Sequence, residues 1–206
     1  MSALIIGLTG GIASGKSAAT AAFERRGIRV ADADIAARDA VRPGSAGLDA
    51  VVAQFGPDAL LPDGTLDRAA MRQRIFADPG ARERLEAIIH PQVRLALQMA
   101  CEGAPGPYAI AAIPLLAEGG RHHYPWLQRV LVIDVPVAVQ LSRLLARDGI
   151  DHTLATQMID AQASREARLS IADDVIANDD SLTMLDRRIG ELDARYRALA
   201  ATQSHG

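Results

Sequence analysis

The segment from residue 3 to residue 31 constrains the fold more than any other part of the chain. Residues 3–8 are continuously apolar, which is typical of a strand buried on both faces of a parallel sheet. A glycine-rich turn at 9–15 leads into an alanine-rich helix over about 16–26, which ends at Gly27. A second short strand at 28–31 completes a βαβ unit. The segment therefore predicts an α/β fold with a parallel sheet.

The glycine-rich turn matches the pattern G-x-x-x-x-G-K-[ST] of a phosphate-binding loop, because residues 10–17 read Gly-Gly-Ile-Ala-Ser-Gly-Lys-Ser. Glycine lets such a loop fold its backbone N–H groups around phosphate oxygens, and the following helix points its N-terminal amides at the same anion. In this arrangement Lys16 reaches the β- and γ-phosphates of a nucleoside triphosphate, and the Ser17 hydroxyl ligates Mg²⁺. A glycine turn can match by chance, but the flanking strand and helix favour the functional interpretation, as does Lys16, the only lysine in the chain.

Composition excludes several classes of protein. The 206 residues carry a formal charge of −3, and only 3% are aromatic, which does not suit a generic nucleic-acid-binding protein. No apolar run approaches the roughly 18 residues of a membrane span, and the N-terminus lacks the basic segment of a secretory signal. The single cysteine, Cys101, excludes an internal disulfide framework and a multi-cysteine metal site. We expect a cytoplasmic globular protein that binds neither nucleic acid nor membrane.

Three further strand candidates follow later in the chain. They are the apolar runs at 108–113 and 130–133 and a short run at 175–176, which bring the number of candidates to five. The intervening residues 35–107 predict helices and turns but no convincing strand, and Pro91 should kink or restart the helix that contains it.

Two features mark the C-terminal part. A polar helical stretch is interrupted at Asp148-Gly149, and Ser181 caps a final helix with Leu182, Leu185, Ile189, Leu192, Tyr196 and Leu199 on one face. We expect an α/β core of residues 1–34, 108–143 and 170–201, a helical insertion at 35–107 and a charged helical segment at 144–169.

A phosphate-binding loop indicates a nucleoside triphosphate, and three absent features narrow the class of enzyme. The GTPase base-recognition motif N-K-x-D needs a second lysine, which the chain lacks. An L-S-G-G-Q-like motif of a transport ATPase is absent, and the chain is short for a motor. A short α/β chain with a helical insertion suits a kinase of small molecules.

Asp32-Ala33-Asp34 follows the second strand, at the carboxyl edge where open α/β sheets bind ligands. If that strand lies beside the first, one of these carboxylates lies near the γ-phosphate, where it can accept the proton of an acceptor hydroxyl or help to hold Mg²⁺. The alternative is an N-cap for the helix that starts near Ile35. We expect Asp34 to be catalytic, with Asp32 in a supporting role.

Two pairs of arginines flank the charged helical segment. Arg143 and Arg147 lie one helical turn apart, and Arg165 and Arg168 repeat the arrangement at the far end. Mobile arginines suit the charge of a transferring phosphoryl group. The alternative for each is a solvated helix face, which we favour for all but Arg143, for which the two interpretations are balanced.

Isolated polar residues give weaker indications. Asp134 ends a strand pattern and resembles a second Mg²⁺-site acid, although we favour a cap for the helix at Pro136. Glu118 is a candidate ligand at the sheet edge without a strong physical case. The histidines lack metal-ligand spacing with cysteine, and His90 either binds substrate or satisfies a helix end.

The chain resembles the bacterial dephospho-coenzyme A kinase family over nearly its whole length. The resemblance rests on the phosphate-binding loop, on residues 30–36, and on short matches that keep the family's order and spacing. These matches are Gly7-Leu8-Thr9-Gly10-Gly11-Ile12, Asp63-Gly64-Thr65-Leu66, Ile75-Phe76, His90-Pro91, Pro114-Leu115-Leu116-Ala117-Glu118 and Ala172-Asp173-Asp174-Val175-Ile176-Ala177-Asn178.

The resemblance implies a P-loop NTPase fold, with a three-layer α/β/α core around a five-stranded parallel sheet, a helical CoA-binding domain at 35–107 and a lid at 144–169. It implies phosphoryl transfer from ATP, with Mg²⁺, to the ribose 3′-hydroxyl of dephospho-CoA, the last step of CoA synthesis. Asp34 is then the acid/base and Arg143 the lid arginine, beside the catalytic Lys16. The implied ATP contacts are Gly11, Ile12, Ala13, Ser14, Gly15, Lys16, Ser17, Ala18 and, near adenine, Asn178; the implied acceptor contacts are Thr9, Asp34 and His90.

The sequence departs from the family at two positions in the loop region. Ala13 stands where glycine is more frequent, and Ala18 where threonine is common. A small side chain at position 13 is tolerated if its φ is negative. Ser17 still supplies the hydroxyl for Mg²⁺.

Two other functions stay open at this point. A kinase for another small acceptor, such as a nucleoside monophosphate, would be identified by ATP consumption in an acceptor screen. A nucleotide-sensing module would bind ATP without forming product, although it would need neither the Asp32-Ala33-Asp34 edge nor the arginines. The oligomeric state is open between a monomer and a weak homo-oligomer.

Overall fold

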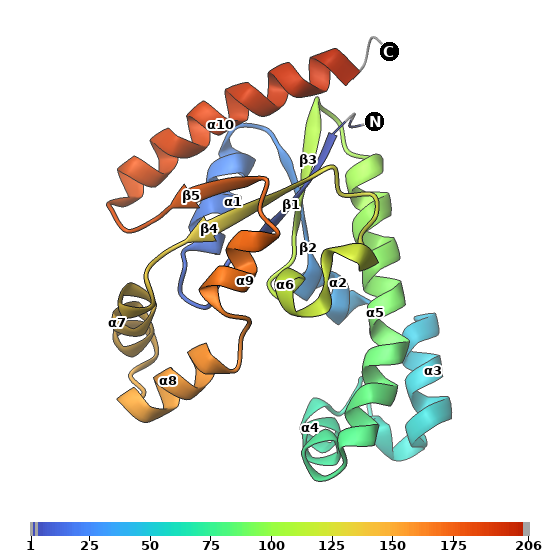
Figure 1. The fold of residues 1–206 in the computed structure, drawn as a ribbon. Helices are drawn as coiled ribbons and strands as arrows, with labels where there is room; N and C mark the ends of the chain where they lie inside the picture. Colours follow the sequence, from blue (N-terminus) through green and yellow to red (C-terminus); the bar gives the residue numbers. More distant parts are fainter. Residues whose placement is uncertain (1, 3, 204–206) are drawn as a thin grey trace. The chain divides into compact units, whose positions relative to one another are not determined.

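The computed structural model describes residue 2 and residues 4–203 and contains a five-stranded parallel sheet (Figure 1). Each of the five strand candidates is confirmed, with ends that shift by one residue. The strands are β1 (Leu4–Thr9), β2 (Arg29–Asp32), β3 (Tyr108–Ala112), β4 (Arg129–Asp134) and β5 (Asp174–Ala177), in the order β2-β3-β1-β4-β5.

β1 is the middle strand of this sheet. It runs parallel to β3, with Ile6 opposite Ile110, and parallel to β4, with Leu8 opposite Leu131. All of β1 and β3 is buried, which explains their continuous apolar sequence. Because β3 separates β2 from β1, the second strand does not lie beside the first. The prediction for Asp32-Ala33-Asp34 assumed that these two strands are neighbours, and this assumption is wrong.

Two helices cover one face of the sheet (Figure 1). α1 (Lys16–Arg25) and α10 (Leu182–Gln203) contact each other and bury Phe23 and Tyr196 against alternate strand residues. The Tyr196 ring meets that of Tyr108 edge-on, with centroids 5.4 Å apart. Ser181 accepts a hydrogen bond from the Met184 N–H, so the predicted cap is confirmed. Leu182 is 70% exposed, so its predicted place on the buried face is wrong.

The other face is covered by shorter elements. α6 (Leu116–Gly119) contributes Leu116 and α9 (Arg165–Ser170) contacts β4. A Cβ at Gly7 would lie 2.8 Å from Leu127 Cδ1, so glycine lets this layer approach β1 closely. Cys101 is fully buried, and its burial raises the thiol pKa to about 11.

The chain divides into two compact units. One consists of the residues before Asp32 together with those from Gln98 onward, and the other is Asp32–Leu97. The second unit holds α2 (Ala33–Asp39), α3 (Ala46–Phe55), η1 (Pro57–Ala59), α4 (Arg68–Ala77) and most of α5 (Pro79–Glu102). Its own small core includes Val51 and Met71. α5 continues through Pro91, so the helix does not restart there.

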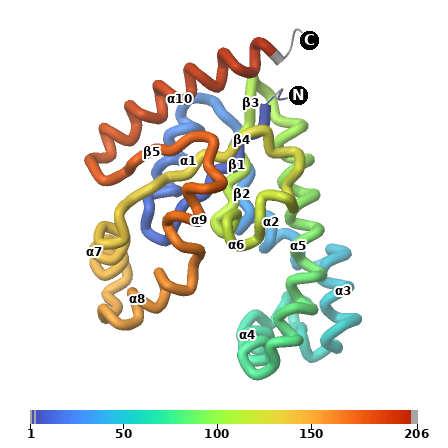
Figure 2. Tube along the Cα trace, viewed as in Figure 1, coloured from blue at the N-terminus to red at the C-terminus, as the bar shows by residue number. Residues whose placement is uncertain are grey.

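Three helices in the first unit link β4 to β5, and Figure 2 follows this stretch from yellow to orange. They are α7 (Val137–Asp148), α8 (His152–Asp160) and α9. Gly149 ends α7 in the left-handed conformation, with φ +64°, which confirms the predicted interruption. Asp151 caps α8 and Ser164 caps α9, each through its side-chain oxygen.

Candidate active site

The glycine-rich loop joins the end of β1 to the start of α1. Ser14 N–H donates to the Gly11 carbonyl at 3.1 Å, which closes a tight turn. Gly15 caps α1 with φ +93°, a conformation that glycine adopts without strain. Ala13 has φ +58°, so the negative φ under which we expected a side chain to be tolerated is not observed. The loop therefore has the sharp backbone of an anion cradle.

Close neighbours require glycine at three positions in the loop. A Cβ at Gly10 would lie 2.7 Å from the Ile133 carbonyl oxygen. One at Gly11 would lie 2.3 Å from Gln140 Nε2 and 2.8 Å from Arg168 Nη2, and one at Gly15 would lie 2.1 Å from Asn178 Nδ2. No Cβ fits at these distances, so the glycines serve packing as well as conformation.

Side chains from distant parts of the first unit hold the loop. Gln162 Oε1 accepts from Ile12 N–H at 2.7 Å, and Gln140 Nε2 donates to the Ile12 carbonyl at 2.7 Å. Asn178 Nδ2 donates to the Ser14 carbonyl at 2.7 Å. We call Gln140, Gln162 and Asn178 the loop clamp. Sequence reasoning missed the two glutamines, because nothing local marks a glutamine whose partner lies more than a hundred residues away.

The groups that would face a nucleotide are left without protein partners. Within the described residues, neither the Lys16 ammonium nor the Ser17 hydroxyl donates a hydrogen bond, and Lys16 forms no ion pair. Ser14 Oγ is buried without a hydrogen-bond partner. A cation and hydroxyls at the start of a helix, beside a loop rich in backbone N–H groups, fit a phosphate chain and its Mg²⁺.

The two aspartates after β2 have different surroundings. Asp32 Oδ1 accepts from Asp34 N–H at 2.7 Å and from Ile35 N–H at 3.2 Å, so Asp32 is the N-cap of α2. Asp34 lies in the first turn with an exposed side chain. Its carboxylate accepts no hydrogen bond from the described residues and is available to a ligand.

The arginines of the 144–169 region differ in their partners. Arg165 forms an ion pair of 2.6 Å with Asp134, and Arg147 one of 2.7 Å with the adjacent Asp148. Arg143 Nη2 donates to the Asn178 carbonyl at 2.8 Å, next to the loop clamp. The fourth, Arg168, is buried.

Asp134 does not cap α7, contrary to our preferred interpretation. The helix begins after Pro136 without a side-chain cap, because the Asp134 carboxylate is held by Arg165 instead. Glu118 accepts from Ala163 N–H at 2.9 Å, which ties α6 to the link between α8 and α9. Thr9 is buried and donates to the Pro114 carbonyl at 3.2 Å, whereas His90 is exposed on α5.

Comparison with known proteins identifies the family. Residues 4–184 match the family described as dephospho-CoA kinase. The chain belongs to the dephospho-CoA kinase family. A dephospho-CoA kinase from Xanthomonas oryzae pv. oryzae is 59% identical over 199 residues, which cover 96% of this chain and 98% of that protein.

Solved structures share the fold. TT1252 from Thermus thermophilus is 31% identical with a TM-score of 0.77, covering 95% of this chain and 98% of its own. A dephospho-CoA kinase from Campylobacter jejuni is 24% identical with a TM-score of 0.72, covering 96% and 98%. The described part of this dephospho-CoA kinase family member has no helix long and apolar enough to cross a membrane.

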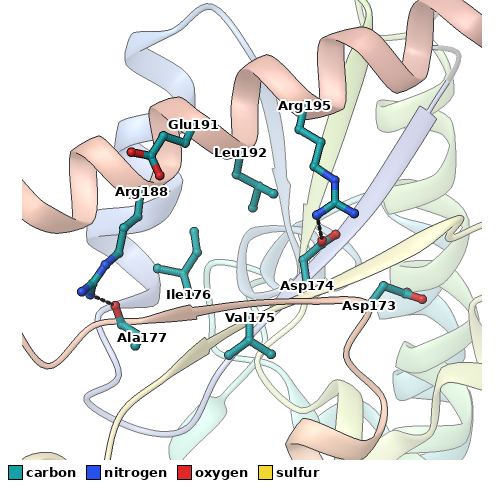
Figure 3. Close-up of a pocket in the computed structure, with 9 residues that line it drawn as sticks. All are labelled: Asp173, Asp174, Val175, Ile176, Ala177, Arg188, Glu191, Leu192 and Arg195. Carbon is teal, nitrogen blue, oxygen red and sulfur yellow. Dashed lines mark hydrogen bonds and ion pairs between the residues drawn. The ribbon is translucent and has the colours of Figure 1, made fainter.

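A cavity of about 670 Å³ lies between β5 and α10, and no residue of the phosphate-binding loop lines it (Figure 3). Its charged groups already have protein partners: Arg195 pairs with Asp174 at 2.8 Å, and Arg188 donates to the Ala177 carbonyl. Burial alone would raise the pKa of Asp174. Hydrogen bonds from Arg129 and from the Tyr196 hydroxyl outweigh burial and hold that pKa below its usual value. These contacts join β4, β5 and α10.

Proposed function

We propose that this protein transfers the γ-phosphoryl group of ATP to the ribose 3′-hydroxyl of dephospho-CoA, giving CoA and ADP, the last step of CoA synthesis. The observation that carries the proposal is a glycine loop whose neighbouring Lys16 has no partner among the described residues, in a chain of the dephospho-CoA kinase family. An unpaired lysine beside a cradle of backbone amides is suited to bind a triphosphate and little else.

The loop residues Gly11–Ala18 hold the phosphates of ATP through backbone N–H groups other than those of Ile12 and Ser14, which bond to Gln162 and Gly11. The Lys16 ammonium binds the β- and γ-phosphate oxygens. Asn178 lies near adenine and holds the loop from behind through its bond to Ser14. Ser17 supplies the protein ligand for Mg²⁺. The metal, when bound, neutralises charge on the phosphates.

Asp34 orients the ribose hydroxyl and accepts its proton. The hydroxyl oxygen bonds to the γ-phosphorus while the bond from that phosphorus to the β–γ bridging oxygen breaks, so ADP leaves and the proton passes from Asp34 to solvent. Two features support this role: the Asp34 carboxylate is exposed and unbonded among the described residues, and it follows the carboxyl end of a strand of the parallel sheet. Asp32 supports it by capping the helix that carries it.

The remaining assignments concern larger segments. The helical unit at 35–107 binds the CoA moiety, with His90, and Thr9 contacts the acceptor. Residues 144–169 form a lid that excludes water, since an open site would hydrolyse ATP, and Arg143 at the boundary of this segment acts on the phosphates. The enzyme acts in the cytoplasm on ATP and dephospho-CoA, as a monomer or a weak homo-oligomer.

The test is to incubate the protein with ATP, Mg²⁺ and dephospho-CoA and to weigh the product by mass spectrometry. We expect one added phosphoryl group, and a screen of nucleoside monophosphates should give no comparable product. Asp34→Asn should lose transfer by about 100-fold or more while it still binds ATP, and Lys16→Ala should lose both. Glu191→Gln, at an exposed carboxylate on α10, is the control and should keep full turnover. ATP binding without product from any acceptor would overturn the proposal.

A further inference from the structure

Arg168 is the one basic side chain that is buried among the residues the structure describes, with 5% of its surface exposed. Its Nη1 donates to the Ala163 carbonyl. No carboxylate of the described chain lies within ion-pair distance of it, whereas Arg147 and Arg165 in the same region each have an acidic partner. A buried guanidinium without an ion-pair partner is costly, because the Ala163 carbonyl and the more distant Glu166 carboxylate replace only part of its lost hydration.

The guanidinium of Arg168 lies at the phosphate-binding loop. Its Nη2 and Cζ would be 2.8 Å and 2.9 Å from a Cβ at Gly11, so only glycine lets the two approach. Arg168 also lines a cavity of about 380 Å³, together with Gln162 of the loop clamp. The acidic residues on that cavity, Asp160 and Glu166, form no ion pair with it. The cation therefore lies next to Gly11 of the loop and also lines a cavity to which Gln162 of the loop clamp contributes.

The loop is suited to bind an anionic phosphate group, and such a group would supply the counter-charge that Arg168 lacks. We propose that Arg168 is a catalytic residue whose guanidinium contacts the transferring γ-phosphoryl group. This inference rests on the proposed function and adds to it, because sequence reasoning favoured a solvated helix face for this residue. The guanidinium stabilises the charge on the equatorial oxygens while the phosphoryl group passes from ADP to the acceptor oxygen.

A structural role and a catalytic role predict opposite effects on stability. If Arg168 served mainly to hold Ala163, its loss would lower the melting temperature. If Arg168 is a buried charge retained for catalysis, its replacement by a neutral side chain removes a desolvation cost from the ligand-free protein. Arg168→Gln should therefore melt no lower than the unmodified protein without ATP and gain less from added ATP.

The kinetic experiment compares Arg168→Gln with Arg187→Gln, an exposed arginine on α10. We expect kcat for dephospho-CoA phosphorylation to fall about 100- to 1,000-fold in Arg168→Gln, with the KM for dephospho-CoA changed less than threefold. Arg187→Gln should keep its kcat. Free guanidinium ion at non-denaturing concentration should restore part of the activity of Arg168→Ala, because it can occupy the vacated space.

Two results in these experiments would overturn the proposal, and nucleotide affinities give a third test. One is a kcat in Arg168→Gln within threefold of the control. The other is a lowered melting temperature together with activity that guanidinium does not restore in Arg168→Ala. The affinities for ATP and ADP test this inference independently of which acceptor is the substrate. Arg168→Gln should weaken the binding of ATP about tenfold more than the binding of ADP, even if dephospho-CoA is not the substrate. Equal weakening of both nucleotides would exclude contact with the γ-phosphate.

Discussion

Ala13 has φ +58°, and every other described residue with positive φ is a glycine. For an L-residue this conformation brings Cβ close to its own carbonyl and costs roughly 1–2 kcal/mol. The strain lies in the middle of the phosphate-binding loop. There the backbone of the neighbouring Ile12 is held at its N–H by Gln162 and at its carbonyl by Gln140. The loop clamp thus maintains a conformation that the alanine alone would disfavour.

Replacing this alanine by glycine should stabilise the protein. Ala13→Gly relieves the left-handed strain but adds freedom to the unfolded chain, so we expect a net gain of about 0.5–1 kcal/mol in the free energy of unfolding. Urea denaturation without nucleotide measures it. Ala18→Gly is the matched control, because Ala18 lies in the first turn of α1, and the same change there should cost about 0.5–1 kcal/mol. A loss of stability in Ala13→Gly would contradict the argument.

The partners of single residues also decide between alternatives that the sequence left open. Asp32 and Asp34 are chemically alike, and only the bonds from Asp34 and Ile35 N–H to Asp32 show which one is the cap. Asp134 was expected to cap α7, but an arginine thirty-one residues away competes for its carboxylate. Local rules describe such residues poorly because their partners come from distant segments.

At the scale of elements, the link between α8 and α9 contacts the phosphate-binding loop directly. Gln162 bonds Ile12 N–H, Ala163 N–H bonds Glu118, and Ser164 caps α9. The link therefore connects the phosphate-binding loop, the α6 segment and the arginines of α9.

Removing the acceptor from Gln162 should weaken ATP binding. Gln162→Leu leaves Ile12 N–H without its partner, so the loop is less well ordered before ATP binds, and we expect the KM for ATP to rise about 5- to 10-fold. Steady-state kinetics at saturating dephospho-CoA measure it. Gln157→Leu, an exposed glutamine on α8, should change the KM less than twofold. An unchanged KM in Gln162→Leu would mean that the bond contributes nothing to the ATP-binding form.

The sequence predicted the elements better than their contacts. The five strands, the loop and the cap Ser181 follow from local patterns, because apolar periodicity, glycine and capping act over a few residues. The strand order could not be predicted from the sequence, because nothing in the sequences of β2 and β3 indicates which of them pairs with β1. The loop clamp and the burial of Arg168 depend on side chains from segments far along the chain, so one local pattern cannot reveal them.

At the scale of the whole molecule, the unit that holds the loop is assembled from two stretches of chain, because residues 32–97 form a unit of their own. α10 joins the last part of that unit to the first. Tyr108 on β3 donates to Asp193 at 2.6 Å, and Tyr196 donates to Asp174 at 2.9 Å. Two buried tyrosines thus add to the polar contacts that Arg188 and Arg195 make between α10 and β5, beside the apolar core of the same face.

Asp174 makes this assembly sensitive to acid. Its pKa is lower in the folded protein than its ordinary value of 3.8. The stabilisation from its bonds to Arg129, Arg195 and Tyr196 is therefore present above that value and is lost as the pH falls through the folded pKa. Asp174→Asn should lower the free energy of unfolding at pH 7 by about 2 kcal/mol, since it removes charge-assisted hydrogen bonds to a buried group.

Urea denaturation of both proteins from pH 7 down to pH 3 measures the effect. The difference in the free energy of unfolding between the unmodified protein and Asp174→Asn should stay constant down to about pH 5. It should then decrease as the Asp174 carboxylate becomes protonated. Glu191→Gln serves as the control, because this exposed carboxylate pairs with Arg187 at 3.9 Å on the surface, where solvent screens the interaction, so its loss should cost less stability. A difference that is independent of pH would show that Asp174 acts through packing alone. A Glu191→Gln effect of equal size would remove the special role of the buried contact between β5 and α10.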